Sequence, residues 1–352
     1  MENSKHFLYL FFFGWIIFSS CQSTEQVTQP DNVYSDHPSD YSVVMVIHGD
    51  SDYLFHENGK AFQADEEVLK DAISVAEEAE TGEFFIFHQK QQRKILWLFK
   101  KDNRQFYHYK NGSLVHQERY KVGEEITPFQ LEGDLYQKHA SISTEQDSNY
   151  FFYFGHEIPL DQKTGYHRSY PSINFSLHTF TEAVDQFTTD ALPKFSLIAL
   201  STCNNGSPDM VTQLSTKTDY LLASSQNLHL SHFDLSPLHL LEDEEVRTHN
   251  TIGREIAEKT YQQLSESTQT AVTLSLYSMD KLDNYLNSMY AGYQQYLRDK
   301  DRFASENTDC RTIEELNFPN PDDGVQQWYR APQFGPQSKV DSHSGWGCKY
   351  ID

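Results

Sequence analysis

Residues 150–157 read YFFYFGHE, and residues 195–206 read FSLIALSTCNNG. Each stretch begins with a mainly apolar run, which predicts a strand that is buried on both faces of a sheet. Each run leads directly into a residue that can carry chemistry, His156 in the first stretch and Cys203 in the second. Between the two stretches, apolar side chains recur at helical spacing at Leu177, Phe180, Val184 and Phe187. A strand, a helix and a strand in this order predict two parallel strands that lie side by side or nearly so.

The alternation of strands and helices continues on both sides of these stretches. Apolar runs predict further strands at 42–47, 84–87, 220–223 and 272–276, and amphipathic patterns predict helices at 65–79, 210–214, 251–264 and 282–293. A different texture, typical of antiparallel strands, occurs at 95–99, 105–109 and 114–120, and Asn111-Gly112 between the last two runs is a strong hairpin signal. The sequence therefore predicts an α/β fold, with a mainly parallel sheet flanked by helices and an antiparallel β insertion.

Charge and composition exclude several classes of protein. The 352 residues include 51 acidic and 28 basic side chains, which gives a formal net charge of −23. A nucleic-acid-binding protein needs a basic face to neutralise phosphates, and the sequence contains no basic patch of that kind. Hydrophobic residues make up 38% of the chain, which is ample for a packed core. Beyond the N-terminus there is no apolar run of about 18 residues, so a polytopic membrane protein is excluded.

The N-terminus has the layout of an export signal. A basic start at Lys5 and His6 precedes an apolar stretch at 7–18 and then Ser19-Ser20-Cys21, as in a secretory signal peptide covering residues 1–20. Small residues directly before a cysteine resemble a bacterial lipobox. This resemblance implies cleavage before Cys21, lipidation of its sulfur, and a lipoprotein of the bacterial cell envelope that contacts the membrane through the anchor. The alternative is a plain cleaved signal peptide or a short N-terminal anchor.

The rest of the chain divides into three parts. Residues 21–40 are polar and lack periodicity, which is typical of a solvated tether. Residues 41–300 contain the predicted strands and helices, and residues 301–352 are acidic and rich in proline, which predicts an irregular C-terminal tail. Two cysteines of the tail, Cys310 and Cys348, are candidates for a disulfide because the chain is expected to be exported.

His156 and Cys203 are the candidate catalytic residues. Loops at the carboxyl ends of parallel strands gather functional side chains, and both residues follow such ends. A nucleophilic cysteine needs a nearby base, for which an imidazole is best matched near neutral pH. Asn204, Asn205 and Gly206 suit the sharp turn that exposes main-chain amides to a developing oxyanion. The alternative reading is that Cys203 is an inert thiol and that His156 is an ordinary loop histidine.

The wider pattern resembles the clostripain family of cysteine endopeptidases, which have a caspase-like fold. The resemblance covers residues 42–297 and rests on segments in the family's order: an opening strand at 43–50, a β-rich excursion at 106–120, the strand and histidine at 150–156, the nucleophile block LIALSTCNNGSPDMVTQL at 197–214, the strand at 220–224 and VTLSLYSMD at 272–280. It implies that Cys203 is the nucleophile, that His156 is the acid and base, and that the main-chain N–H groups of Cys203 and residue 157 bind the oxyanion. Peptide or protein would be the substrate, and no cofactor is implied.

The sequence departs from the family pattern at three points. Glu157 stands where the family has glycine, so a left-handed backbone there would be strained, and its carboxylate would oppose an oxyanion. Ser201 stands where an aspartate is common. The candidate residues of the specificity pocket are Ser224, Ser225 and Asp234, which supply no acid before Asp234, so a preference for basic side chains is not predicted. The alternative function is therefore a catalytically inactive caspase-like surface lipoprotein that acts as a binding module.

Other histidines are weaker candidates than His156. His48-Gly49 also follows a predicted strand, but it is the first strand in the family's order, which lacks the catalytic histidine. The chain has no G-x-S-x-G elbow, so serine hydrolysis is not expected. A group of potential metal ligands falls in one loop without helical register, at His229, His232, Asp234 and His239. No metal site is predicted there, nor elsewhere, because no CxxC or HxxxC pattern occurs.

Overall fold

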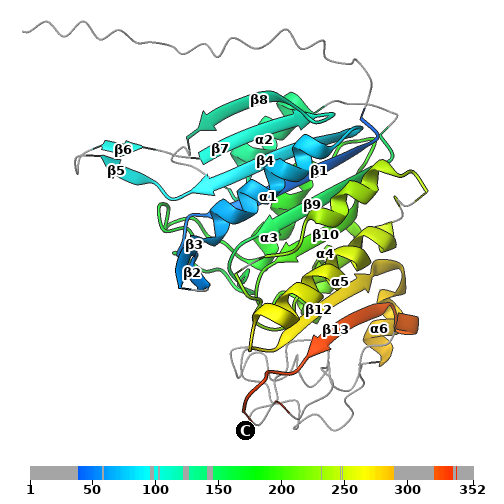
Figure 1. Cartoon of the computed structure of the whole chain (residues 1–352). Helices are drawn as coiled ribbons and strands as arrows, with labels where there is room; N and C mark the ends of the chain where they lie inside the picture. Colours follow the sequence, from blue (N-terminus) through cyan, green and yellow to red (C-terminus); the bar gives the residue numbers. More distant parts are fainter. Residues whose placement is uncertain are drawn as a thin grey trace, which may run out of the picture. The chain divides into compact units, whose positions relative to one another are not determined.

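A computed structural model describes residues 39–57, 59–95, 99–101, 104–121, 127–140, 146–230, 232–245, 247, 249–288, 321–335 and 338. Its centre is a nine-stranded sheet in the order β13-β12-β11-β10-β9-β1-β4-β7-β8 (Figure 1). The central strands run parallel to one another: β11 (Thr218–Ala223), β10 (Phe195–Ser201), β9 (Ser148–Phe154), β1 (Tyr41–Gly49) and β4 (Gly82–Lys90). Antiparallel strands complete both edges: β7 (Arg104–Lys110), β8 (Ser113–Tyr120), β12 (Val272–Ser278) and β13 (Val325–Arg330). The predicted α/β class, with a parallel centre and an antiparallel insertion, is confirmed.

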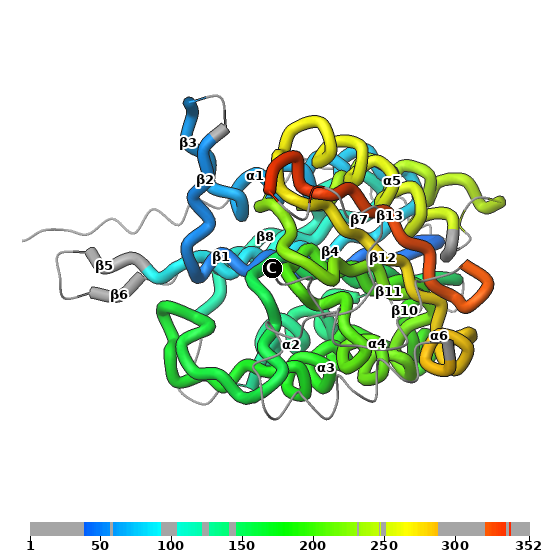
Figure 2. The backbone as a smooth tube through the Cα atoms, turned by 90° about the horizontal axis from the view of Figure 1, so that it is seen from below, coloured from blue at the N-terminus to red at the C-terminus, as the bar shows by residue number. Residues whose placement is uncertain are grey.

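Helices cover both faces of the sheet, which explains why the central strands are apolar along their whole length. One face packs against α1 (Ala64–Glu78), η2 (Ser236–Glu242) and α5 (His249–Ser267). The other face packs against α2 (Gln130–His139), α3 (Leu177–Val184), η1 (Asp185–Phe187), α4 (Pro208–Leu214) and α6 (Leu282–Ser288). Figure 2 shows α1 and α5 on one side of the sheet and α2, α3 and α4 on the other. All nine residues of β1 are buried, as expected for a strand between two helical layers.

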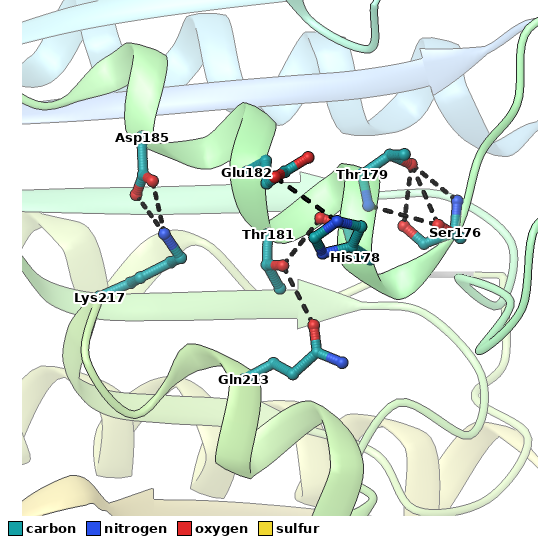
Figure 3. Close-up of polar contacts among 8 residues, drawn as sticks. All are labelled: Ser176, His178, Thr179, Thr181, Glu182, Asp185, Gln213 and Lys217. Carbon is teal, nitrogen blue, oxygen red and sulfur yellow. Dashed lines mark hydrogen bonds and ion pairs between the residues drawn. The ribbon is translucent and has the colours of Figure 1, made fainter.

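Helix α3 is the crossover between β9 and β10. Its first turn is closed by a reciprocal capping box, in which the Ser176 hydroxyl accepts from the Thr179 N–H and the Thr179 hydroxyl accepts from the Ser176 N–H (Figure 3). Farther along the chain, Lys217 donates to the Asp185 carboxylate at 2.6 Å. This ion pair joins the end of the helical segment to the residues that precede β11.

The hairpin predicted at Asn111-Gly112 is present between β7 and β8. Both residues have positive φ, 49° and 74°, as the tight turn requires. The run at 95–99, predicted as one strand, instead contains the end of β5 (Arg93–Ile95) and the start of β6 (Phe99–Lys101), which pair with each other outside the main sheet. A second small ribbon consists of β2 (Leu54–Glu57) and β3 (Lys60–Gln63).

The C-terminal region differs from its prediction in one segment. Residues 301–352 were expected to be irregular, but β13 pairs with β12 along its whole length, and Val325 is buried. η6 (Pro321–Asp323) precedes this strand. The predicted leader and tether at residues 1–38, the lipidation site Cys21, and the disulfide candidates Cys310 and Cys348 lie outside the described residues. Within the described part, none of the helices has the length and apolar character needed to cross a bilayer.

Candidate active site

The register of β9 and β10 brings the two candidate catalytic residues to equivalent positions. Phe154, the last residue of β9, lies opposite Ser201, the last residue of β10. His156 and Cys203 each follow two residues later, at the carboxyl ends of adjacent parallel strands. The two segments remain hydrogen-bonded beyond the ends of the strands, since the Gly155 N–H donates to the Ser201 carbonyl at 3.3 Å. The sequence-based expectation that these strands are neighbours is confirmed.

Cys203 is a partly exposed thiol that lies against the segment following β11. Its Sγ accepts from the Leu228 N–H at 3.3 Å and donates to the Leu228 carbonyl at 3.5 Å. The next residue, Asn204, has a left-handed backbone with φ of 55°, and its N–H donates to the Gln226 carbonyl at 2.9 Å. The chain therefore turns sharply directly after the thiol, as the predicted nucleophile turn requires.

Gly206 explains why that turn can pack against the end of β11. Its N–H donates to the Ser224 carbonyl at 2.7 Å, and its carbonyl accepts from the Tyr277 hydroxyl at 3.1 Å. A Cβ at this position would lie 2.8 Å from the Ser225 nitrogen. Glycine is thus required here by the close approach of two main chains.

His156 is held by three groups from the loop after β1. Its ring stacks on Tyr53, with centroids 4.5 Å apart and planes 18° from parallel. The main-chain N–H of His156 donates to the Tyr53 hydroxyl at 3.1 Å. Burial lowers the pKa of His156, and a hydrogen bond between its ring and the Asp52 main chain partly offsets this effect. The imidazole is therefore mainly neutral near pH 7 and has a fixed orientation.

His48, the competing histidine, lies beneath this arrangement and not in it. It is fully buried, and both ring nitrogens are in contact with other side chains: Nδ1 with the Tyr53 hydroxyl at 2.6 Å and Nε2 with His167 Nδ1 at 3.0 Å. Tyr53 connects this buried pair to His156, so His48 supports the ring that supports His156. A Cβ at Gly49 would lie 2.5 Å from Asp65 Oδ2, so a larger residue there would displace the Asp65 carboxylate.

Paired asparagines join the loop after β9 to the loop after β10. The Asn205 side chain accepts from the Ile158 N–H at 2.9 Å and donates to the Ile158 carbonyl at 3.0 Å, and both residues are buried. Next to it, Asn204 Nδ2 donates to Glu157 Oε2 at 2.6 Å and to Asn227 Oδ1 at 3.2 Å. The loops that carry His156 and Cys203 are therefore fixed to each other by side chains.

Glu157 does not carry the strain that the comparison with the family suggested. Its backbone is not among the residues with positive φ, so a glutamate is tolerated at this position. Its carboxylate binds Asn204, one residue beyond the thiol, at 2.6 Å. The carboxylate of Glu157 nevertheless lies in the loop that carries His156, within the candidate site.

The three candidate pocket residues are placed differently from one another. Ser224 and Ser225 are both buried, and the Ser224 hydroxyl donates to the Gln226 carbonyl at 2.9 Å. Asp234 accepts from the Ser236 N–H at 2.9 Å and donates its own N–H to Thr260 on α5. These contacts give Ser224 and Asp234 structural partners, and none of them joins Asp234 to Cys203.

A hollow of about 390 Å³ opens at the carboxyl ends of β1 and β4, and neither His156 nor Cys203 is among its lining residues. Asp52, whose main chain orients the His156 ring, also lines this hollow. The other charged lining residues carry both signs: Asp65, Glu66, Lys90, Arg119 and Arg168. The hollow therefore offers space for a ligand without a strong preference for one sign of charge, and Asp52 is its link to the candidate site.

The sheet and the paired loops define the class of this protein: a caspase-like α/β fold with a histidine and a cysteine at adjacent strand ends. Among solved structures it resembles a secreted C11 cysteine protease from Bacteroides thetaiotaomicron in complex with an irreversible peptide inhibitor, with a TM-score of 0.50, 13% identity, and coverage of 71% of this chain and 69% of that one. It also resembles the B. thetaiotaomicron C11 protease iotapain, with a TM-score of 0.51, 14% identity, and coverage of 72% and 70%. At this identity the similarity shows a shared fold. No family model and no curated protein matches the sequence.

The sequence indicated His156 and Cys203 as candidates but did not indicate the residues around them. Tyr53, Asp52 and His167 come from distant loops, and nothing in their local sequence links them to His156. Tyr166 was missed as well: its hydroxyl donates to the His156 carbonyl at 2.9 Å, and its pKa is raised mainly by burial, then by Tyr153 and to a smaller extent by Cys203. The sequence indicated Asn205 only as a turn residue. The asparagine pair directly after the candidate nucleophile is the one signal that could have indicated its contact with the loop that carries His156.

Proposed function

We propose that this chain is an exported cysteine endopeptidase of the clostripain type. The observation that carries the proposal is the register of β9 and β10, which sets His156 and Cys203 at equivalent positions on adjacent strand ends. The oriented, mainly neutral imidazole supports it, because a base must be deprotonated to activate a thiol. The fold that the chain shares with C11 proteases also supports the proposal.

In the proposed reaction, Cys203 Sγ transfers its proton to His156 and attacks the carbonyl carbon of a peptide bond. The oxyanion is bound by the main-chain N–H groups of Cys203 and Glu157. Collapse of this intermediate breaks the C–N bond, and His156 returns the proton to the departing amine, which leaves a thioester on Cys203. His156 then removes a proton from water, which attacks the thioester. Release of the carboxylic acid regenerates the thiol.

Labelling with a thiol-reactive peptide probe tests this proposal. We expect the native full chain to bind one equivalent of an acyloxymethyl ketone peptide covalently, and Cys203→Ala to bind none. Unfolding the chain before labelling should abolish the reaction, because the probe requires the folded site. For the same reason, it should not label the other thiols. The endopeptidase proposal fails if the native chain is not labelled, or if Cys203→Ala is labelled to the same extent.

A non-catalytic binding module is the second candidate, and two observations favour it. The Leu228 main chain contacts Cys203 Sγ on both its donor and acceptor sides, and the Glu157 carboxylate lies in the loop that would supply an oxyanion donor. A module of this kind would bind peptides without cleaving them. Equal retention of a peptide by the native chain and by Cys203→Ala, without probe labelling, would support it.

We further propose that the chain is a bacterial envelope lipoprotein anchored through Cys21, with peptides as its partners on the outer side of the membrane. The support is the order of basic, apolar and small residues before Cys21. Mass spectrometry of the mature N-terminus after expression in a bacterium with lipoprotein processing is the test. We expect a diacylated Cys21 and a membrane fraction that loses the protein in Cys21→Ala. A mature chain that begins at another residue would exclude the anchor.

A further inference from the structure

A second cluster of reactive side chains lies at the opposite edge of the sheet from β13. His116 and Glu118 are on β8, the last strand, and His139 is the final residue of α2. Residues two apart on a strand share a face, so His116 and Glu118 point to the same side of the sheet. Strands β1, β4 and β7 separate β8 from β9, so this cluster is distinct from the candidate active site.

The sheet register shows that this side is the one covered by α2. His116 pairs with His108 on β7, which pairs with Phe85 on β4, and Phe85 belongs to the core beneath α2. From Tyr120, which donates to Glu132 near the start of α2 at 2.8 Å, the strand runs back four residues to His116, about 13 Å. The helix covers about 10 Å from Glu132 to His139. The end of α2 therefore reaches His116.

The buried polar atoms at the two ends of α2 differ in whether they have hydrogen-bond partners. At the start, Glu132 Oε1 receives three donors, from Arg104, Gln89 and Tyr120, at 2.7–3.0 Å. At the end, three atoms have almost no solvent exposure and no hydrogen bond: His116 Nε2, Glu118 Oε1 and His139 Nε2. Native proteins rarely leave buried polar atoms without a partner, and one shared partner can satisfy three such atoms that lie close together.

The geometry of these atoms fits a metal ion. One potential ligand atom from each of the three residues lies within 4.8 Å of the other two, and His116 Nε2 is 3.4 Å from Glu118 Oε1. Two ligands bound about 2.0–2.2 Å from a tetrahedral ion lie about 3.3–3.6 Å apart, so this pair already has the required spacing. The rings of His116 and His139 lie against each other, with centroids 4.3 Å apart and planes 24° from parallel. Within the described part of the chain, no other group of this kind occurs.

We propose that His116, Glu118 and His139 bind a divalent transition-metal ion of the Zn²⁺ class, with water in the fourth position. Imidazole nitrogens favour such ions over Ca²⁺ and Mg²⁺, which prefer oxygen ligands. The bound ion would fasten the end of α2 to the edge strand β8 and would stabilise the fold at that edge.

Metal titration of the full chain tests the site. After treatment with a chelator, we expect the native protein to bind one equivalent of Zn²⁺, and to give the intense visible absorption of tetrahedral Co²⁺ when Co²⁺ replaces it. His116→Ala and His139→Ala should weaken binding by at least about 100-fold, since a lost ligand costs more than a lost outer-shell partner. Glu118→Gln keeps the volume of the side chain and should also weaken binding.

The matched control is His178→Ala. His178 and Glu182 form an exposed i, i+4 pair at 3.5 Å on α3 (Figure 3), so this variant removes a histidine next to a glutamate without touching the cluster. It should bind zinc like the native chain. Zinc at 100-fold excess over its Kd should raise the Tm of the native chain and of His178→Ala by roughly 5 °C, and that of His139→Ala by much less.

Three outcomes would overturn the proposal. One is the absence of stoichiometric zinc binding by the native chain, which would reduce the cluster to a histidine–glutamate ion pair. Another is equal binding by His139→Ala and the native chain, provided that circular dichroism shows the variant to be folded. The third is binding of Ca²⁺ in preference to Zn²⁺. Probe labelling of Cys203 is independent of all three, so failure of the metal site and failure of the peptidase proposal can be distinguished.

Discussion

Asn205 is the residue on which the relative position of the two candidate catalytic loops depends most directly. One amide group satisfies both the N–H and the carbonyl of Ile158, and so joins the strand end that carries Cys203 to the one that carries His156. Such a bidentate contact fixes distance and orientation together, which a single hydrogen bond does not. A small misplacement of a nucleophile relative to its base is costly in rate, so this contact matters for chemistry as well as for stability.

We therefore predict two effects of Asn205→Ala. Two buried main-chain groups of Ile158 lose their partners, which should lower the free energy of unfolding by about 2–4 kcal/mol. Covalent labelling at Cys203 should slow by at least about tenfold in the fraction that remains folded. Urea unfolding and the labelling rate are the measurements. Asn227→Ala removes an exposed amide from the facing loop and should change stability by less than about 0.5 kcal/mol. Equal behaviour of the two variants would contradict the positioning role.

At the scale of elements, the strands could be predicted because burial on both faces produces uninterrupted apolar runs. β1, β4, β9 and β10 all follow this rule, and the helix between the last two fixed their adjacency. Since His156 and Cys203 directly follow such strands, predicting the strands also predicted the centre of the candidate site. The contacts of Tyr53 and Asp52 with His156 could not be predicted, because they join residues about a hundred positions apart through tertiary packing alone.

Helix α2 shows why other elements were missed. It begins after Phe129, which has a left-handed backbone with φ of 59° and provides no side-chain cap, and it contains Gly133. Its buried residues include Glu132 and Tyr136, so the apolar periodicity that marks a helix is absent. The polar partners of α2 are in the strands beneath it. For the same reason, His139 could not be connected to His116 and Glu118 from the sequence, although the H-x-E spacing on one strand face was visible.

At the scale of the whole molecule, acid has two opposing effects on stability. The formal net charge of −23 implies self-repulsion that weakens as carboxylates and histidines gain protons. Against this, the buried pair of His48 and His167 lies in a site that disfavours protonation. Burial and the neighbouring His167 hold the pKa of His48 well below its usual value, and burial lowers the pKa of His167 to about 3. The second effect belongs to identifiable residues, so substitution can isolate it.

We predict that His167→Gln makes the unfolding free energy less sensitive to acid. Below about pH 6.5 the unfolded chain protonates both histidines and the folded chain does not, so protons favour unfolding. The stabilising contribution of this pair is therefore complete above pH 6.5 and is lost as pH falls toward the folded pKa, by up to about 1.4 kcal/mol per pH unit for each histidine. Glutamine cannot titrate. Between pH 6.5 and 5, His167→Gln should therefore reduce the change in unfolding free energy per pH unit by up to the contribution of one histidine, as measured by urea unfolding. His178→Gln, at an exposed position, should keep the native slope, and identical slopes in His167→Gln and the native chain would show that His167 is protonated in the folded protein.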